Sequence, residues 1–415
     1  MKSLLCSLVA LCLLGTAIAG DLTYTVKQTS DWVFYSPNCP QIEVIATNGG
    51  TQTAQTTLAL CVTTDDNQPI SHFVQQFAVA PQTTNALSFS FSVPSPGFYR
   101  CTLLDGEDNI VKKFNIGYEP ENIVSLCDAQ PDLKAFWDQA RAELATVAPQ
   151  YELTLLPEQS NKTRNIYLVK MQSLGGETIS GYYATPTKKG KYPAIITFMG
   201  YGSEPWLLKA NDNPQFVEFV LSVRGQGLNK ADNKYGDWIT YGLGDKERYY
   251  YRGAFMDLIR AIDFVASRDE VRDDAIFAEG GSQGGAFTLA ACALDHRICA
   301  AAPYIPFLSD YADYFRIVHW PAEVVINKQR ELSLSDVDLY RMLSYFDIKN
   351  LAPWITCPIK MGAGLQDEVC PPHTNFSGYN RISTEKSYTI FPTCGHDVGA
   401  AWWPARMEFF KKHIQ

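Results

Sequence analysis

The chain has 415 residues, of which 46% are hydrophobic, and its formal net charge at pH 7 is -9. This length accommodates two domains, and the apolar content predicts packed globular structure rather than disorder. The negative charge argues against a nucleic-acid-binding protein, which needs a basic surface to neutralise phosphates.

The first 19 residues have the pattern of a secretory signal peptide. Lys2 precedes an apolar run from Leu4 to Ile18, and Ala17-Ile18-Ala19 offers small residues for cleavage before Gly20. An uncleaved N-terminal anchor is the alternative. No later stretch reaches the ~18 apolar residues that a membrane-spanning helix needs. We therefore predict an exported protein that is periplasmic or extracellular, with a bacterial envelope as the expected setting. After cleavage of the signal peptide, we expect no association with a membrane.

Residues 20–118 are expected to form a small all-β sandwich of the immunoglobulin-like type. Segments rich in Thr, Val and Phe alternate with turn signals such as Asn-Gly-Gly and Asp-Gly. About seven short strands in about 100 residues are typical of such a sandwich. The expected strands are 33–35, 42–46, 56–62, 73–79, 87–93, 98–104 and 111–117.

The chain has 11 cysteines, of which Cys6 and Cys12 fall in the proposed signal peptide. Neither a CxxC pair nor a Cys/His spacing typical of zinc sites occurs. Most cysteines lie in apolar segments, which favours buried thiols. Cys61 and Cys101 stand in a context similar to the bridged strands of immunoglobulin-like sandwiches, so a disulfide between them is left open. We predict no metal and no organic cofactor.

Residues 119–130 are expected to link the β-rich part to a second domain, residues 131–415. Apolar residues from Leu133 to Val147 follow a helical spacing, and Ala148-Pro149 is a stop signal. Strands and helices then alternate, which indicates an α/β fold with a mainly parallel sheet. A helical excursion at about 306–350 interrupts this alternation. Its aromatic residues fit either a lid that narrows the pocket or core packing against the neighbouring domain: Tyr311, Tyr314, Phe315, Trp320, Tyr340 and Tyr345.

The residues most suited to chemistry follow predicted strands of this second domain. Expected strands at 194–198, 216–223, 275–279, 358–362 and 387–391 run into Met199–Gly202, Arg224–Gly227, Gly280–Gly285, Leu365–Asp367 and Pro392–His396. Active sites of open parallel sheets lie beyond the carboxyl ends of the strands. These segments are therefore expected to meet in one site.

Gly280-x-Ser282-x-Gly284 matches the nucleophile elbow of α/β-hydrolases. A strand is predicted before it and a helix after it, as the elbow requires. The two glycines allow strand and helix backbones to pass closely, and the helix N-terminus favours developing negative charge. Ser282 is therefore the predicted nucleophile.

A serine hydroxyl needs a base, and the base needs an orienting acid. His396 lies in a Gly-containing loop after the last predicted strand, where α/β-hydrolases place their base, and His373 is the runner-up. Asp367 follows a strand and falls between nucleophile and base in the chain, as this fold requires. The alternative acids are Asp336, Asp338 and Asp347, in the helical excursion.

An oxyanion hole needs two preset N–H donors. One would be the backbone amide of Gln283, directly after the nucleophile. The other would come from Tyr201, in the Gly200-Tyr201-Gly202 turn.

Four blocks together resemble the acetyl xylan esterase and cephalosporin C deacetylase family. They are Arg224-Gly225-Gln226-Gly227, the Ser282 block Gly280–Gly285, Leu365-Gln366-Asp367 with Cys370-Pro371-Pro372, and Tyr379-Asn380. The resemblance spans about residue 130 to the C-terminus. It implies hydrolysis of acetyl esters on xylose-containing oligosaccharides by a serine, with Ser282, Asp367 and His396 as the triad and Tyr201 and Gln283 as oxyanion donors.

The resemblance also gives an architectural role to Arg224, Gly225 and Gln226 and implies that the chain can form homo-oligomers. This chain departs from the family pattern at Met199, where His is usual, and at Asp397, where Glu is usual; both positions could alter substrate preference. Two alternatives stay open. One is a lipase-like or peptidase-type serine hydrolase on the same fold, and the other is a non-catalytic glycan-binding protein.

Overall fold

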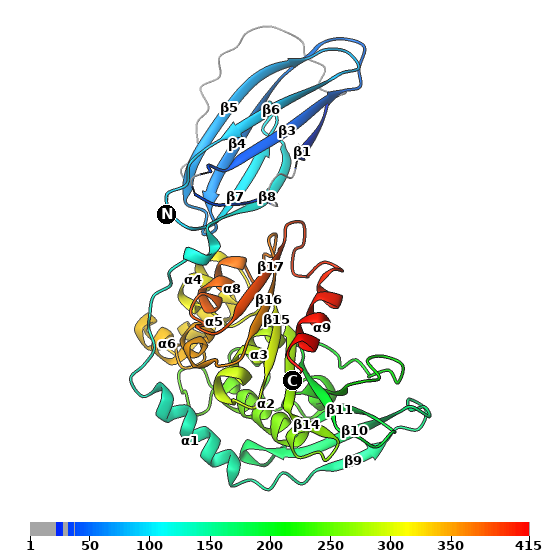
Figure 1. Cartoon of the computed structure of the whole chain (residues 1–415). Helices are drawn as coiled ribbons and strands as arrows, with labels where there is room; N and C mark the ends of the chain where they lie inside the picture. The colour runs from blue at the N-terminus through cyan, green and yellow to red at the C-terminus, as the bar shows by residue number, and fades with distance from the viewer. Residues whose placement is uncertain (1–21, 28–31, 37, 415) are drawn as a thin grey trace. The chain divides into compact units, whose positions relative to one another are not determined.

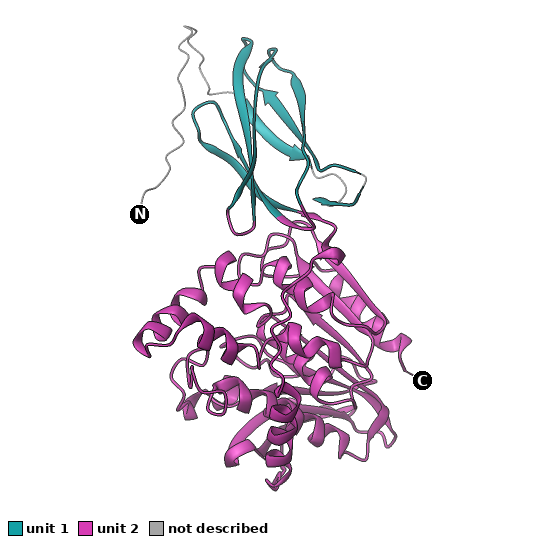
Figure 2. Cartoon of the chain, turned by 90° about the vertical axis from the view of Figure 1, so that its left-hand side faces the viewer, with its two compact units in different colours: residues 1–64, 68–94, 99–116 teal, residues 65–67, 95–98, 117–415 magenta. Residues whose placement is uncertain are grey.

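The computed structural model describes residues 22–27, 32–36 and 38–414, so the predicted signal peptide lies outside the described residues. Within those ranges, no helix combines the length and the apolar character that crossing a membrane requires. The chain divides into two compact units (Figure 2). Unit 1 consists of residues 1–64, 68–94 and 99–116, and unit 2 of residues 65–67, 95–98 and 117–415.

The N-terminal strands form two sheets with antiparallel pairing (Figure 1). One sheet has the order β1 (Leu22–Lys27), β3 (Gln41–Asn48) and β6 (Thr84–Ser90). The other has the order β2 (Val33–Phe34), β8 (Ile110–Tyr118), β7 (Gly97–Leu104), β4 (Ala54–Thr64) and β5 (Pro69–Val79). Every second residue of β3 is buried, as expected for a strand with one face in a core. The predicted all-β fold of this part is confirmed, although the sequence reading missed β1.

The candidate disulfide between Cys61 and Cys101 does not form. Both residues lie on the neighbouring antiparallel strands β4 and β7, where Cys61 is opposite Thr102 and Cys101 is opposite Val62. Successive side chains of a strand point to opposite faces, so the two thiols lie on different faces of one sheet. Burial raises the pKa of the Cys101 thiol, which keeps it neutral.

Unit 2 is built on a nine-stranded sheet. Its order is β17 (Lys386–Phe391), β16 (Ile359–Gly364), β15 (Ala300–Tyr304), β14 (Val271–Gly281), β12 (Tyr192–Phe198), β13 (Val217–Ser222), β11 (Glu177–Pro186), β10 (Arg164–Ser173) and β9 (Glu152–Leu155). Neighbours from β17 to β13 are parallel, whereas β11, β10 and β9 pair antiparallel at one edge. The predicted α/β fold with a mainly parallel sheet is confirmed.

Helices cover both faces of this sheet (Figure 1). On one face α1 (Leu133–Ala145), α2 (Tyr250–Ala266) and α3 (Gln283–Leu294) share a core with Ile196 of β12. On the other face α9 (Trp402–Lys412) packs against Ile195 of the same strand. Adjacent residues of β12 therefore serve two cores, which explains why Ile195 and Ile196 are both apolar instead of alternating with polar residues.

The helical excursion contains α4 (Tyr311–Ile317), α5 (Ala322–Glu331), α6 (Asp336–Leu343) and α7 (Ile348–Leu351). Tyr311 and Tyr314 are buried in the core of unit 2 itself, so these two residues pack within their own unit and do not form a lid. Trp320, between α4 and α5, is instead 40% exposed. Other elements of unit 2 are α8 (Pro372–Tyr379) and the short helices η3 (Pro120–Asn122), η4 (Leu174–Gly176), η5 (Gly227–Asp232) and η6 (Ala352–Trp354).

The segment expected as a linker, residues 119–130, is fastened to unit 2. Asn380, at the end of α8, donates side-chain hydrogen bonds to the carbonyls of Pro120 and Ile123, at 2.9 and 3.0 Å. Ser125 bonds to Ser377 through the two hydroxyls, at 2.8 Å. These bonds hold residues 119–130, which form only the short helix η3, against α8 of unit 2.

Candidate active site

Ser282 occupies the turn between β14 and α3 and has φ 57° and ψ -123°. A positive φ is strained for a residue with a side chain, so the surrounding structure must impose it. The Ser282 N–H donates to the Tyr304 carbonyl at 3.1 Å, and the Ser282 carbonyl accepts from Gly285 at 2.9 Å and Phe307 at 3.0 Å. Both backbone groups of the serine are thereby fixed, and the side chain projects from a defined turn.

The turn is possible only because two flanking positions are glycine. A Cβ atom at Gly280 would lie 2.5 Å from the Gly284 carbonyl oxygen. One at Gly284 would lie 2.1 Å from the Phe198 carbonyl oxygen of neighbouring β12. The glycines therefore allow the elbow to cross directly over the end of β12, as the motif predicts.

Asp367 and His396 form a hydrogen-bonded pair after the adjacent strands β16 and β17. The His396 Nδ1 lies 2.9 Å from Asp367 Oδ2 and 3.1 Å from Oδ1. The carboxylate is buried and also accepts the backbone N–H groups of Val369 and Cys370, each at 2.8 Å. His396 keeps 32% of its side chain exposed. A carboxylate at Nδ1 favours a proton there, which leaves Nε2 free to act as a base.

Cys370 connects this pair to the serine. Its backbone N–H binds Asp367, and its Sγ lies 4.0 Å from Ser282 Oγ. Burial raises the pKa of the Cys370 thiol well above its usual value, so it stays neutral. Among the described residues, Ser282 and His396 share no direct hydrogen bond; such catalytic bonds often shorten only when substrate binds. The structure thus places all three predicted triad residues at the carboxyl ends of strands in one sheet, with Ser282 after β14 and Asp367 and His396 after β16 and β17, and with β15 between β14 and β16.

The two expected oxyanion donors lie at the ends of β12 and β14, which are neighbours in the sheet. Neither the Tyr201 nor the Gln283 backbone N–H donates a hydrogen bond within the part of the chain that the structure describes. Gln283 is the first residue of α3, so its N–H has no partner in the helix. Both amides are therefore able to donate to a bound oxyanion.

Gln226 joins the two turns that carry these amides. Its Oε1 accepts the Gly202 backbone N–H at 3.0 Å and the Gln283 side-chain amide at 3.1 Å. Its own amide donates to the Tyr250 hydroxyl at 2.8 Å. Gln226 and Gln283 are both buried, so these bonds are not exchanged for water. One side chain thus sets the spacing between the Tyr201 turn and the start of α3.

Replacing Gln226 with leucine should lower kcat about tenfold while leaving KM nearly unchanged. The substitution removes the shared acceptor, and a displaced oxyanion donor weakens only interactions made in the transition state. Steady-state kinetics on p-nitrophenyl acetate measure the split. Gln226→Glu keeps an acceptor oxygen and is the matched control; equal loss in both variants, or a change in KM alone, would contradict this role.

Arg224 lies next to the site in the sequence and forms a buried ion pair with Asp257. Its guanidinium binds both carboxylate oxygens of Asp257 in α2, at 2.7 and 2.9 Å, and also donates to the Leu174 carbonyl. Gly225 follows with φ +68°, and a Cβ there would lie 2.8 Å from Asn233 Oδ1. Both residues shape the wall next to Gln226 and neither reaches Ser282.

Aromatic side chains border the oxyanion turn. The Tyr201 ring packs edge-on against Trp238 and Trp320, with ring centroids 5.0 and 5.4 Å away, and its hydroxyl donates to Asp237 at 2.8 Å. Phe307 stacks on Trp320 at 6.1 Å. The excursion therefore contributes Trp320 to the site wall, while its buried tyrosines belong to the core. Of the two residues that depart from the family pattern, Met199 is buried and Asp397 is exposed.

The alternative base does not reach the nucleophile. His373 lies in α8, where its two ring nitrogens pair with Asp65 and Asp313 of the same unit, at 2.8 and 3.4 Å. Burial opposes its charge, but these carboxylates raise the pKa of His373 to about 10. The charged His373 therefore contributes its full stabilisation of the fold below pH 6.5, the ordinary pKa of histidine. This contribution is lost as the pH rises toward 10 and His373 loses its proton.

The alternative acids serve the helices of the excursion. Asp336 accepts a hydrogen bond from Gln329, Asp338 pairs with Arg341, and Asp347 caps the N-terminus of α7.

One cluster of side chains has the spacing of a cation site: the ligand atoms of Asp310, Asp313 and His373 lie within 4.8 Å of one another. Because both His373 nitrogens already face carboxylates, the protonated ring satisfies this cluster as an ion pair.

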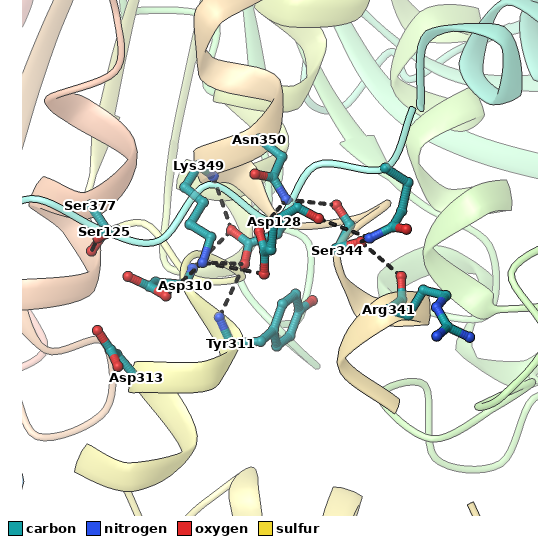
Figure 3. A network of polar contacts seen from close by, with 12 residues as sticks. Ser125, Asp128, Asp310, Tyr311, Asp313, Arg341, Ser344, Lys349, Asn350 and Ser377 are labelled. Atoms are coloured by element: carbon teal, nitrogen blue, oxygen red, sulfur yellow. Dashed lines mark hydrogen bonds and ion pairs between the residues drawn. The ribbon is translucent and has the colours of Figure 1, made fainter. Parts of the chain in front are cut away.

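A buried lysine anchors the segment that follows β15 (Figure 3). Lys349 Nζ is fully buried and lies 2.8 Å from Asp310, 3.5 Å from Asp128 and 3.9 Å from Asp347. Asp347 accepts the backbone N–H of Asp310 at 2.8 Å. Ile305, Leu308 and Asp310 all have positive φ, so this network holds a strained stretch. The same stretch contains Phe307, whose N–H binds the Ser282 carbonyl. The sequence reading missed this support because Asp310 is joined to Asp347 and Lys349, 37 and 39 positions away, and Lys349 also pairs with Asp128, more than 200 positions away.

The sheet order, the serine elbow and the Asp–His pair after the last two strands define an α/β-hydrolase. A family model described as "Acetyl xylan esterase (AXE1)" matches residues 122–414. The chain therefore belongs to the acetyl xylan esterase family and is a carboxylic-ester hydrolase, which confirms the family resemblance inferred from the sequence.

Individual relatives agree with this assignment. The acetyl esterase Axe7A of Xylanibacter ruminicola is 26% identical over 441 aligned residues, covering 100% of this chain and 98% of the relative. Acetyl xylan esterase 1 from Thermoanaerobacterium sp. JW/SL YS485 is 27% identical with a TM-score of 0.66, covering 72% of this chain and 98% of that one. The acetyl xylan esterase from Paenibacillus sp. R4 is 29% identical with a TM-score of 0.67, covering 71% and 99%.

Proposed function

We propose that this protein is an exported serine carbohydrate esterase that removes acetyl groups from xylo-oligosaccharides or related acetylated sugars. The observation that carries the proposal is the Asp367–His396 hydrogen bond beside the strained Ser282 turn, in a chain of the acetyl xylan esterase family. The acetyl esterase and acetyl xylan esterases named above support an acetyl group as the acyl part of the substrate.

The proposed reaction begins when Ser282 Oγ attacks the acetyl carbonyl carbon and His396 Nε2 takes the hydroxyl proton. Asp367 stabilises the resulting imidazolium, and the Tyr201 and Gln283 amides bind the oxyanion. His396 then gives its proton to the sugar oxygen, which leaves as an alcohol, and acetyl-Ser282 remains. Water attacks this ester with His396 again as base, and acetate leaves as the proton returns to Ser282.

Acetate release from acetylated xylo-oligosaccharides, compared with other acetylated glycans, tests the sugar class. We expect the xylo-oligosaccharides to give the highest kcat/KM. Equal or higher values on acetylated glycans without xylose would contradict the proposed substrate while leaving the esterase assignment intact.

The length of the acyl chain tests the acetyl preference. We expect kcat/KM to fall about tenfold or more from p-nitrophenyl acetate to the butyrate, because added methylenes overpack a small acyl pocket. The aromatic ring pairs beside Tyr201 give the wall little room to yield. Similar rates on both esters would instead favour a lipase-like enzyme.

A further inference from the structure

Unit 2 contains a cavity of about 430 Å³ on the face of the sheet that α9 covers. Its floor includes Thr197 of β12 and Glu279 of β14, which are opposite each other in the parallel register. Its sides come from the loop after Tyr201 and from α9. The volume lies within the range of small-molecule binding sites. No step of the proposed reaction uses this cavity.

Two tryptophans line the cavity from different segments. Trp206 in the loop after β12 is 47% exposed, and Trp403 in the first turn of α9 is 42% exposed. Tyr304 packs edge-on against Trp403, with ring centroids 5.6 Å apart. Large apolar side chains that border one hollow and stay exposed to water mark a binding surface more often than scattered single ones do. Flat aromatic faces suit the C–H faces of sugar rings.

Charged and polar groups complete the lining. Glu279 is buried, accepts a hydrogen bond from Thr197 at 3.3 Å and pairs with Arg406 of α9. Lys209 adds an ammonium donor, and Asn213 adds an amide that also donates to Glu218 at 2.8 Å. An acyl chain or another purely apolar ligand would take water from these charged and polar groups without offering them new hydrogen bonds, at an unfavourable free energy. A ligand with many hydroxyls and one apolar face matches both parts of the lining.

The cavity adjoins the candidate active site along the chain and through the sheet. Trp206 follows Tyr201 in the same loop, and Trp403 follows the His396 loop at the start of α9. The carbonyl of Tyr304 accepts the Ser282 N–H at 3.1 Å. A Cβ at Gly281 would lie 2.1 Å from the Tyr304 ring, so the ring lies directly against the nucleophile turn. The cavity and the site therefore share a wall.

We propose that the cavity bounded by Trp206, Tyr304 and Trp403 is an accessory glycan-binding site for unesterified pyranose units of a xylose-containing chain. This inference rests on the proposed function, because it assigns to the same substrate a second point of attachment. The tryptophans hold the faces of the sugar rings, and the polar groups near Glu279 and Arg406 bind the hydroxyls. Occupation of this site anchors a long glycan next to Ser282.

Binding of unacetylated xylohexaose to the Ser282→Ala variant tests the site without turnover. We expect saturable binding by calorimetry, weakened about tenfold or more when Trp206→Ala and Trp403→Ala are added. Leu332→Ala, which removes another exposed apolar side chain of unit 2 outside the cavity, is the matched control and should not alter binding. Unchanged affinity in the tryptophan variant would overturn the proposal, as would a changed oligomeric state with no change in affinity.

Kinetics separate this inference from the proposed function. These measurements use the active enzyme, in which Ser282 is present. The selectivity ratio is kcat/KM on acetylated xylo-oligosaccharide divided by kcat/KM on p-nitrophenyl acetate. The two tryptophan substitutions together should lower this ratio by about fivefold or more, because they raise KM for the oligosaccharide. The single variants Trp206→Phe and Trp403→Phe keep an aromatic face and should retain most of the ratio. If the parent enzyme releases no acetate from the oligosaccharide, the proposed function fails. If the parent enzyme does release acetate and the tryptophan variant has the same ratio as the parent, only the proposal of an accessory site fails.

Discussion

Replacing Ser282 with alanine should lower kcat on p-nitrophenyl acetate by about four to six orders of magnitude, the loss that follows removal of a triad nucleophile. The Oγ atom is the only group that the proposed reaction acylates. The neighbouring thiol of Cys370 does not substitute for it, because burial keeps that thiol protonated. Steady-state assays of both proteins at equal protein concentration measure the loss.

The substitution should leave the fold intact, because the turn is held by backbone groups. The Ser282 N–H and carbonyl keep their bonds to Tyr304, Gly285 and Phe307 whatever the side chain. Melting curves of both proteins should therefore agree, and alanine at a strained positive φ is no worse than serine there. Ser267→Ala, at the end of α2, is the control for loss of a serine hydroxyl away from the site. A Ser282→Ala enzyme with wild-type activity would remove the serine mechanism.

The location of the candidate site could be predicted because it depends on the order of local signals. Each of the segments ending in Tyr201, Ser282, Asp367 and His396 follows an apolar strand, and parallel strands bring their carboxyl ends to one edge. The structure places β12, β14, β15, β16 and β17 side by side. Local pattern and general topology were therefore sufficient to bring together residues nearly 200 positions apart.

Pairing between particular strands could not be predicted in the same way. The antiparallel edge β9–β11 precedes the alternating part, and its sequence gives no sign of which strand it joins. The question of a Cys61–Cys101 disulfide, which the sequence left open, has a similar cause. Cys61 and Cys101 were correctly expected on strands, but only the register shows that β4 and β7 are neighbours in one sheet. A change of register by one residue reverses the face of every side chain.

The contacts that support the site were also beyond the reach of sequence patterns. Gln226 was expected to be architectural, yet its bonds to Gly202 and Gln283 depend on three loops meeting in space. The cavity beside Trp206 and Trp403 unites segments with no common motif. Long-range side-chain contacts of this kind follow from the packed fold, whereas motifs report only local chain geometry.

Replacing Lys349 with methionine should lower the free energy of unfolding of unit 2 by about 3–5 kcal/mol. Methionine has nearly the same length, so little packing is lost. The charge is lost, and the buried carboxylates of Asp310 and Asp347 then face each other without a cation. Burial opposes the charge of Lys349, but these carboxylates raise its pKa, so the native lysine is protonated.

Urea unfolding followed by tryptophan fluorescence measures the change in stability. Lys328→Met is the matched control, because Lys328 and Glu331 form an exposed ion pair that contributes only about 0–1 kcal/mol. Adding Asp310→Asn to Lys349→Met should restore part of the loss by removing one uncompensated charge. A loss below about 1 kcal/mol in Lys349→Met would contradict the role of this network.

The same variant links stability to the candidate site. Asp310 begins α4 and ends the strained stretch whose Phe307 N–H binds the Ser282 carbonyl. Without the Lys349 cation, the carboxylates of Asp310 and Asp347 repel each other and this stretch can relax. The Ser282 carbonyl then loses its hydrogen bond from the Phe307 N–H. We therefore expect Lys349→Met to lower kcat as well, even where the protein remains folded. Lys328→Met should not alter kcat, because no hydrogen bond joins α5 to that turn among the residues that the structure describes.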